Sequence, residues 1–213
     1  MIETESNRIQ GPTDLMKVYA EVVSRMAETL YYDDVEKSHF FAFRDACTRG
    51  QSLSKIALAE ILLERNLHFK RGLFLGHWHG LLPLLLNKMG LVDEGVGVEL
   101  SKYWSRFSDT INRDWPWKSQ EKDATQLQES FFKNEFFDLV VNTSCEHMNF
   151  NWLTYVPAGT TVLVQANNYQ IPEHTNIQES LAGLIKNVGL SEIHFSGEQD
   201  FPVYKRFTVL GKK

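Results

Sequence analysis

A turn containing glycines is the first feature of this chain whose residue types suggest chemistry. A short apolar strand expected at residues 72–75 leads into Gly76-His77-Trp78-His79-Gly80, and a helix is expected to follow. Glycine lets a backbone approach a ligand closely, and the free N–H groups at the start of a helix bind anions. We therefore predict that Gly76, His77, Trp78 and Gly80 contact the anionic part of a cofactor.

Two acidic residues follow the next two expected strands. Glu99 lies in the strand expected at residues 95–100, and an acid at this place accepts hydrogen bonds from ribose hydroxyls. Asp123, followed by Ala124, comes after a strand expected at residues 118–122, where an acid can accept from the amine of adenine. The glycine turn and both acids are predicted to surround one adenosine-type ligand at the same edge of a sheet.

A polar segment follows the strand expected at residues 137–142, and we predict the reaction there. Asn142 and Ser144 can position a nucleophilic amine, while His147 or Glu146 can remove a proton. The alternative is that Asn142, Thr143 and Ser144 only cap the next segment. We interpret Asn142, Ser144 and His147 as catalytic, with Asn142 also in contact with the cofactor.

Polar side chains also follow the strand expected at residues 160–165. They are Gln165, Asn167, Asn168 and Tyr169, with Glu173 and His174 after Pro172. These residues either recognise a substrate or form an ordinary turn, and the sequence leaves both interpretations open.

Histidine and cysteine near these positions allow a metal site as an alternative. His77 and His79 lie in the turn, while Cys145, Glu146 and His147 follow a neighbouring strand. Such side chains can bind zinc or iron. A His-x-His pair in a tight turn need not converge on one ion, however, and no third ligand is fixed by the spacing. We therefore predict no metal ligands and interpret the histidines as pocket walls or as hydrogen-bonded structural residues.

The first 68 residues are expected to be helical. After Pro12, apolar residues recur at helical spacing: Leu15, Val18, Tyr19, Val22, Val23, Met26 and Leu30. A second helix is expected to open at residues 33–34, to carry Phe40, Phe41 and Phe43, and to end at residues 49–50. A third is expected to start at Ser52 or Ser54. The apolar faces of these helices are predicted to be core.

From residue 69 onward, short apolar segments alternate with helical ones, which is typical of βαβ units and a mostly parallel sheet. Strands expected near residues 193–197 and 205–211 have no helix between them, so we predict that they pair antiparallel at one end of the sheet. The predicted fold is α/β, with a Rossmann-like, mostly parallel sheet at residues 69–213, helices on both of its faces and an antiparallel C-terminal strand. Residues 1–68 are predicted to form an N-terminal helical cover over the cofactor pocket.

Residues 70–211 resemble the class I S-adenosylmethionine (SAM) dependent methyltransferase superfamily. The segment Phe137-Asp138-Leu139-Val140-Val141-Asn142 is similar to the fourth-strand motif of that family, Glu99 matches its second-strand acid, and Asp123 matches its adenine-side acid. The first motif departs from the family, which has an acid in the strand and a small turn where this chain has His77-Trp78-His79. The resemblance implies SAM as cofactor and a methyl transfer to a small molecule.

Three alternatives remain open at this point. The unusual turn should lie beside the methionine part of SAM, so attack on its aminocarboxypropyl carbon, with release of methylthioadenosine, is the first. Nicotianamine synthases (by transfer) and azetidine-2-carboxylate synthases (by intramolecular cyclisation) use this route on the same fold. A metal-dependent enzyme built on the histidine and cysteine residues is the second, and a cofactor-binding partner subunit without activity is the third.

The composition of the chain limits the kinds of binding partner that we expect. A net charge of −5 over 213 residues disfavours a protein that binds nucleic-acid phosphates. The chain starts without the basic and apolar order of a secretory signal, no apolar stretch is long enough to span a membrane, and two cysteines imply no disulfide framework. We expect a cytoplasmic enzyme with a small-molecule substrate, and keep a homodimer open.

Overall fold

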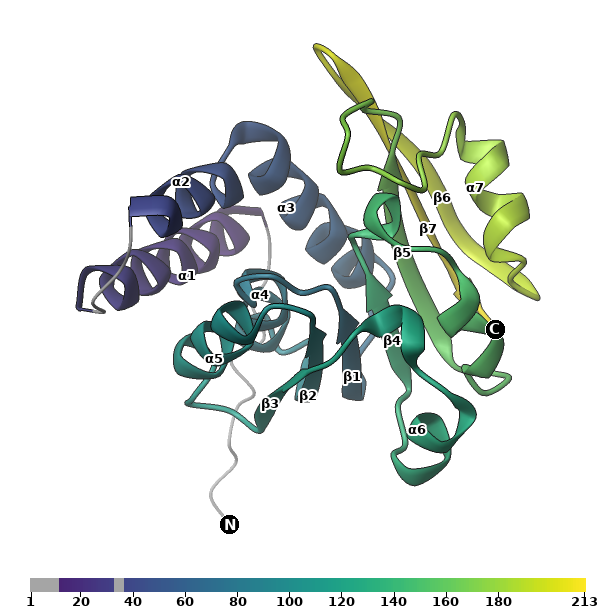
Figure 1. Ribbon diagram of the computed structural model, residues 1–213, viewed down its shortest axis with the longest axis horizontal. Helices are drawn as coiled ribbons and strands as arrows, with labels where there is room; N and C mark the ends of the chain where they lie inside the picture. The colour runs from purple at the N-terminus through teal and green to yellow at the C-terminus, as the bar shows by residue number, and fades with distance from the viewer. Residues whose placement is uncertain (1–11, 33–36) are drawn as a thin grey trace.

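The computed structural model describes residues 12–32 and 37–213 (Figure 1). Helices of the N-terminal region come first, and strands then alternate with helices until two final strands follow each other directly. The elements are α1 (Pro12–Tyr32), α2 (Lys37–Ala46), α3 (Arg49–Glu64), β1 (Phe69–Leu75), α4 (Leu81–Lys88), β2 (Val92–Glu99), α5 (Lys102–Ile111), β3 (Trp117–Glu121), α6 (Glu129–Asn134), β4 (Leu139–Asn142), β5 (Thr161–Asn167), α7 (Leu181–Val188), β6 (Glu192–Phe201) and β7 (Tyr204–Lys212), with 3-10 turns η1 (Ala124–Gln126), η2 (Cys145–His147) and η3 (Asn151–Tyr155).

The strands form one sheet in the order β3-β2-β1-β4-β5-β7-β6. Neighbours from β3 to β5 are parallel, whereas β7 is antiparallel to both β5 and β6. The predicted mostly parallel sheet with an antiparallel C-terminal strand is therefore confirmed. The strand order reverses between β1 and β4, where Leu75 lies opposite Asn142. Ligands of open α/β sheets bind outside the carboxyl ends of the strands at such a switch point.

Both faces of the sheet are covered by helices, as predicted. Successive side chains of a strand point to opposite faces. Phe74 of β1 joins a core that includes residues of α1, α3, α4 and α5, whereas Leu73 and Leu75 join a second core with residues of α6 and α7. Figure 1 shows the N-terminal helices grouped with α4 and α5, away from α6 and α7.

The helix α1 confirms the predicted apolar face, because Leu15, Tyr19, Val22, Met26 and Leu30 are buried. These residues belong to the same core as Phe74 of β1. The structure does not test the division of the chain at residue 68, which stays a prediction. None of the described helices has the length and apolar composition needed to cross a bilayer.

The predicted bounds of the next two helices are partly wrong. Residues 49–50 begin α3 instead of ending α2, which ends at Ala46. Ser52 and Ser54 lie inside α3, where the Ser54 hydroxyl donates to the Gly50 carbonyl one turn earlier and so does not cap a helix. The expected start at residues 33–34 lies outside the described residues.

Part of the apolar surface of α2 is also exposed, against the prediction that it is core. Phe40 and Phe41 are 53% and 58% exposed, while Phe43 packs against the core. The helix α7 begins at Leu181 after the N-cap Ser180. The short helix α6 was not predicted; it has six residues and too little periodicity to stand out.

Candidate functional site

The glycine turn after β1 lies at the carboxyl edge of the sheet and has an unusual backbone. Gly76, Trp78 and Gly80 have φ values of 58°, 52° and 74°. A left-handed φ costs a residue with a side chain roughly 1–2 kcal/mol, so Trp78 must be held in place by its surroundings. The Trp78 N–H donates to Oε2 of Glu99 at 2.9 Å, and this bond fixes the turn.

Glu99 links the turn to the next helix. Its other oxygen, Oε1, accepts the N–H of Ser101 at 3.0 Å, just before α5 begins. Each carboxylate oxygen has a second lone pair, and Glu99 is only half-buried, so both oxygens can still accept from a ligand. The turn and the acid that were predicted to converge are in direct contact.

Close packing explains the glycines at both ends of the turn. A Cβ on Gly80 would lie 2.1 Å from Oγ of Ser108 in α5, and a Cβ on Gly76 would lie 3.1 Å from Cβ of Ser144. The Ser144 hydroxyl donates to the Gly76 carbonyl at 2.9 Å. The segment after β4 therefore rests directly on the turn.

The two histidines of the turn point into the protein. Nε2 of His77 lies 2.8 Å from Oγ of Ser119 in β3, and its ring occupies the space above Gly97. His79 is 1% exposed and packs against Trp104, with ring centroids 4.1 Å apart. Burial lowers the pKa of each imidazole to about 3, so both rings are neutral near pH 7. His79 is too buried to face a cofactor, whereas His77 stays partly exposed.

The second predicted acid lies beside the end of β2. The Lys122 N–H donates to the Glu99 carbonyl, which places Asp123 next to Glu99 at the same edge. Oδ1 of Asp123 accepts from both the N–H and the hydroxyl of Thr125, at 2.8 and 2.7 Å. Oδ2 is left to accept from a ligand, and Ala124 is buried behind it.

Asn142 ends β4 with an unsatisfied donor. The side chain is fully buried, its Oδ1 accepts the Ser144 N–H at 2.9 Å, and its Nδ2 has no hydrogen-bond partner among the described residues. A buried group without a partner costs about 1–3 kcal/mol, which favours a ligand atom at this place. Cys145 is fully buried, and burial raises the pKa of its thiol well above the usual value, so the thiol is not activated as a nucleophile.

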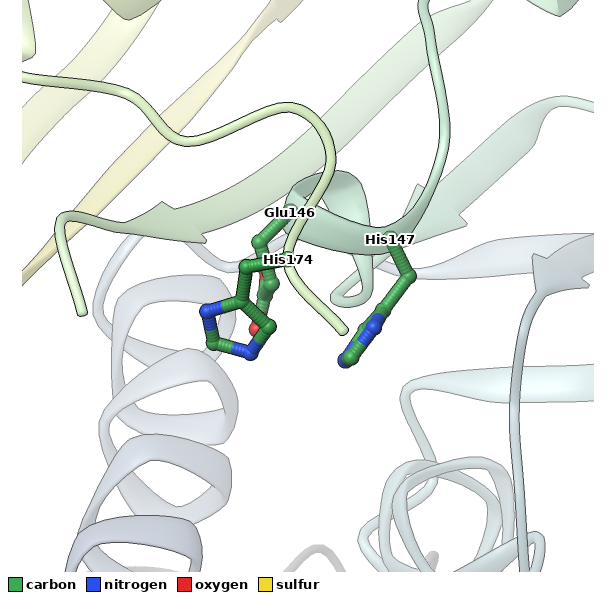
Figure 2. A group of neighbouring side chains, drawn as sticks. All are labelled: Glu146, His147 and His174. Carbon is green, nitrogen blue, oxygen red and sulfur yellow. The ribbon is translucent and has the colours of Figure 1, made fainter. Parts of the chain in front are cut away.

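Glu146, His147 and His174 form a cluster at the ends of β4 and β5 (Figure 2). A ligating atom of each lies within 4.8 Å of those of the other two, and in the described part of the chain no other group of three His, Cys, Asp or Glu side chains comes together in this way. The cluster excludes His77, His79 and Cys145. The metal alternative considered from the sequence therefore combined residues that the fold separates.

The sequence predicted a role for His147 but left His174 undecided. The sequence did contain a signal for this cluster. Glu146 and His174 follow strands that are neighbours in the sheet, and histidine and carboxylate side chains at adjacent strand ends can converge. What the sequence does not show is the course of the loop between them. Asn176 fixes that loop by donating to the carbonyls of Cys145 and Met148 at 2.9 and 2.8 Å.

Lys55 and Arg206 form a second feature that the sequence reasoning missed. Nζ of Lys55 donates to Gln51 in α3, and Arg206, 6% exposed in β7, donates to Gln165 of β5. No carboxylate among the described residues pairs with either cation, and Nε of Arg206 has no partner there. Burial, and then the charge of Arg206, lowers the pKa of Lys55 to about 7. The sequence signal for this feature was Lys55, the one lysine between Arg49 and Glu60 in a helix whose apolar face was expected to be in the core.

Known proteins resemble this chain in structure and not in sequence. No protein-family model matches it, and no curated protein matches its sequence. The N-methyltransferase NodS from Bradyrhizobium japonicum WM9 has a TM-score of 0.60 at 10% identity, over 79% of this chain and 98% of that one. Magnesium protoporphyrin IX methyltransferase (ChlM) from Synechocystis PCC 6803, solved with bound SAM, has a TM-score of 0.59 at 14% identity, over 98% of this chain and 100% of that one.

A SAM-dependent methyltransferase from Clostridium acetobutylicum ATCC 824 is similar to the same degree, with a TM-score of 0.58 at 15% identity, over 82% of this chain and 98% of that one. At such identities the likeness shows the fold alone. The chain has the Rossmann-like α/β fold of these methyltransferases, and the predicted fold class is confirmed.

Proposed function

We propose that this protein is a SAM-dependent transferase that methylates a small molecule. The observation that carries the proposal is the contact between the Trp78 N–H and Glu99 at the switch point of a methyltransferase fold. On this basis the turn of residues 76–80 faces the methionine part of SAM, although the N–H groups of Gly76, Trp78 and Gly80 already donate to Val98, Glu99 and His77. The free lone pairs of Glu99 accept from the ribose hydroxyls, and Asp123 with Ala124 lies against adenine. The family likeness of the fold supports SAM as the cofactor.

The reacting end lies at β4 in this proposal. Asn142 Nδ2, the buried donor without a partner, and the Ser144 hydroxyl position the acceptor. The acceptor's lone pair forms a bond to the methyl carbon while the carbon–sulfur bond breaks, and sulfur keeps the electron pair as S-adenosylhomocysteine. The acceptor's proton passes to Nε2 of His147, because Nδ1 already faces the Glu173 carbonyl.

The proposed acceptor carries an acidic group. Lys55 of α3 is half-buried, Arg206 of β7 is buried, and neither has a carboxylate partner in residues 12–32 and 37–213. Buried cations without a counter-ion are costly, and a carboxylate or phosphate of the acceptor would offset that cost. The N-terminal helices, which contribute Lys55, would then cover the acceptor in a cytoplasmic enzyme without nucleic-acid partners.

The product nucleoside tests the reaction. The protein is incubated with SAM, alone and with mixtures of small carboxylic and phosphorylated amines, and the nucleosides are separated by chromatography. S-adenosylhomocysteine that depends on an acceptor supports methyl transfer. Methylthioadenosine instead shows attack on the aminocarboxypropyl carbon, and its release without any acceptor shows cyclisation. If neither SAM nor S-adenosylhomocysteine binds in calorimetry, the proposal is wrong.

A further inference from the structure

The tautomers of the two histidines in the cluster Glu146, His147 and His174 are fixed by their surroundings. Nδ1 of His147 lies 3.1 Å from the Glu173 carbonyl, and Nδ1 of His174 lies 2.6 Å from the Tyr169 carbonyl. A carbonyl can only accept, so each Nδ1 carries a proton and each neutral ring has its lone pair on Nε2. This is the arrangement in which histidine binds metals, with the other ring nitrogen donating to a backbone carbonyl.

Glu146 supplies a carboxylate that is oriented in the same way. The side chain is 5% exposed, and Oε1 accepts from Nδ2 of Asn167 at 2.6 Å. Oε2 is buried and has no hydrogen-bond partner among the described residues. A buried carboxylate oxygen without a partner is expensive, and a bound cation would satisfy it.

The cluster is also supported by its backbone. Glu146 and His147 lie in η2 directly after β4, and His174 comes from the loop after β5; Figure 2 shows the three side chains extending to the same side of the chain. Asn176 ties the two segments together, since its N–H donates to the Glu146 carbonyl and its side chain to the Cys145 carbonyl. One ligating atom of each side chain lies within 4.8 Å of those of the other two, and these atoms would have to come closer together to reach metal–ligand distances of about 2.0–2.2 Å.

From these observations we infer that Glu146, His147 and His174 bind one divalent transition-metal ion, such as Zn²⁺, Fe²⁺ or Mn²⁺. Two imidazoles and one carboxylate leave coordination positions open, as in sites where an ion holds a substrate. His147 is exposed, so the open positions are accessible from solvent. The ion would bind an oxygen or nitrogen of the acceptor next to Ser144. With the ion bound, His147 would be a ligand and not the base proposed above, and the acceptor's proton would pass to solvent. The inference does not depend on SAM as the cofactor.

Metal titration without SAM tests the site. Purified protein is stripped with a chelator and titrated with Co²⁺, followed by its visible absorption, and with Zn²⁺ in a calorimeter. We expect one ion per chain. His147→Gln and His174→Gln should each weaken binding at least about tenfold, and His147, being exposed, is the ligand whose replacement disturbs the fold least. His68→Gln is the matched control, because His68 is an exposed histidine paired with Asp93 outside the cluster.

Two results would overturn the inference. One is no binding of either ion up to about millimolar concentration by a protein whose circular dichroism shows it folded. The other is binding that both cluster variants retain at full affinity, which would locate the ion elsewhere. Because SAM is absent from these titrations, either result leaves the cofactor proposal to its own calorimetric test.

Discussion

Replacement of Glu99 by alanine should weaken both the fold and cofactor binding. Glu99 accepts two backbone N–H groups, from Trp78 at 2.9 Å and from Ser101 at 3.0 Å. Hydrogen bonds to a charged group are worth about 1.5–3 kcal/mol each, but Glu99 is half-buried and water can replace part of that. The freed turn can also relax the left-handed φ of Trp78, which returns roughly 1 kcal/mol. We expect a net loss of about 2 kcal/mol in the free energy of unfolding.

Cofactor binding should fall by a separate amount. If the remaining lone pairs of Glu99 accept from ribose, Glu99→Ala removes a charged partner, which corresponds to about 1.5–3 kcal/mol, or roughly 10- to 150-fold in Kd. Unfolding is measured in urea by tryptophan fluorescence and binding by calorimetry with S-adenosylhomocysteine. Glu121→Ala is the control, because Glu121 lies beside Glu99 in register at the end of β3 but is exposed. It should change stability by less than about 0.5 kcal/mol and leave Kd unchanged.

The two measurements separate the roles of Glu99. A destabilised Glu99→Ala variant whose Kd stays within about twofold of the original protein would mean that Glu99 only holds the turn. The proposed ribose contact would then be refuted, whatever the fold. Glu99→Gln keeps one acceptor oxygen and should lose about half as much stability as Glu99→Ala.

Three further predictions follow from buried groups. The imidazole of His79 has a pKa of about 3 when folded and 6.5 when unfolded, so the unfolded chain binds more protons in that window. This residue should therefore lower stability by up to about 1.4 kcal/mol per unit as the pH drops from 6.5 to 3. In urea titrations His79→Phe should remove this contribution and leave the similar one of His77. The pKa of Lys55 is lowered from 10.5 to about 7, so the free energy of unfolding should rise with pH between these values. Lys55→Met should abolish that rise and stabilise the protein by about 1 kcal/mol at pH 6. The same variant should turn over an acidic acceptor more slowly. Gly80→Ala should lower the free energy of unfolding by more than about 2 kcal/mol, because its Cβ would meet Ser108. Gly90 also has a positive φ but nothing within 4 Å of a Cβ, so Gly90→Ala should lower it by only about 1 kcal/mol. Equal losses of stability in thermal unfolding would show that the contact with Ser108 relaxes freely.

The cofactor half of the site was predictable because its signals are local. Gly76 and Glu99 each stand at the end of a strand that the apolar pattern identifies, and parallel strands bring their carboxyl ends to one edge. Where the chain folds locally in an unexpected way, prediction failed. Trp78 has a positive φ and the ring of His77 lies beside Ser119, and no residue pattern predicts a tryptophan in the left-handed region.

The acceptor half could not be predicted because its contacts are long-range. Lys55 of α3 feels the charge of Arg206 in β7 only in the folded chain, and the face of a helix that covers a sheet edge is set by tertiary packing. His174 approaches Glu146 only because Asn176 binds two carbonyls of the η2 region across the intervening loop. Neither arrangement has a fixed spacing in the sequence, so composition and periodicity show the residues without showing that they meet.

Both halves of the site contain buried polar groups without partners among the described residues, although the carboxylate of Glu99 is held firmly. Glu99 is held by two backbone N–H groups in the absence of any ligand, so the cofactor half is preorganised. On the β4, β5 and β7 side, Asn142 Nδ2, Glu146 Oε2 and Arg206 Nε are buried without partners among the described residues. In the turn, Nδ1 of His77 and both ring nitrogens of His79 are in the same state. Each such group costs about 1–3 kcal/mol, and proteins keep such costs mainly where a ligand offsets them. An acceptor or a metal ion that pairs with the buried groups of β4, β5 and β7 should therefore stabilise the fold.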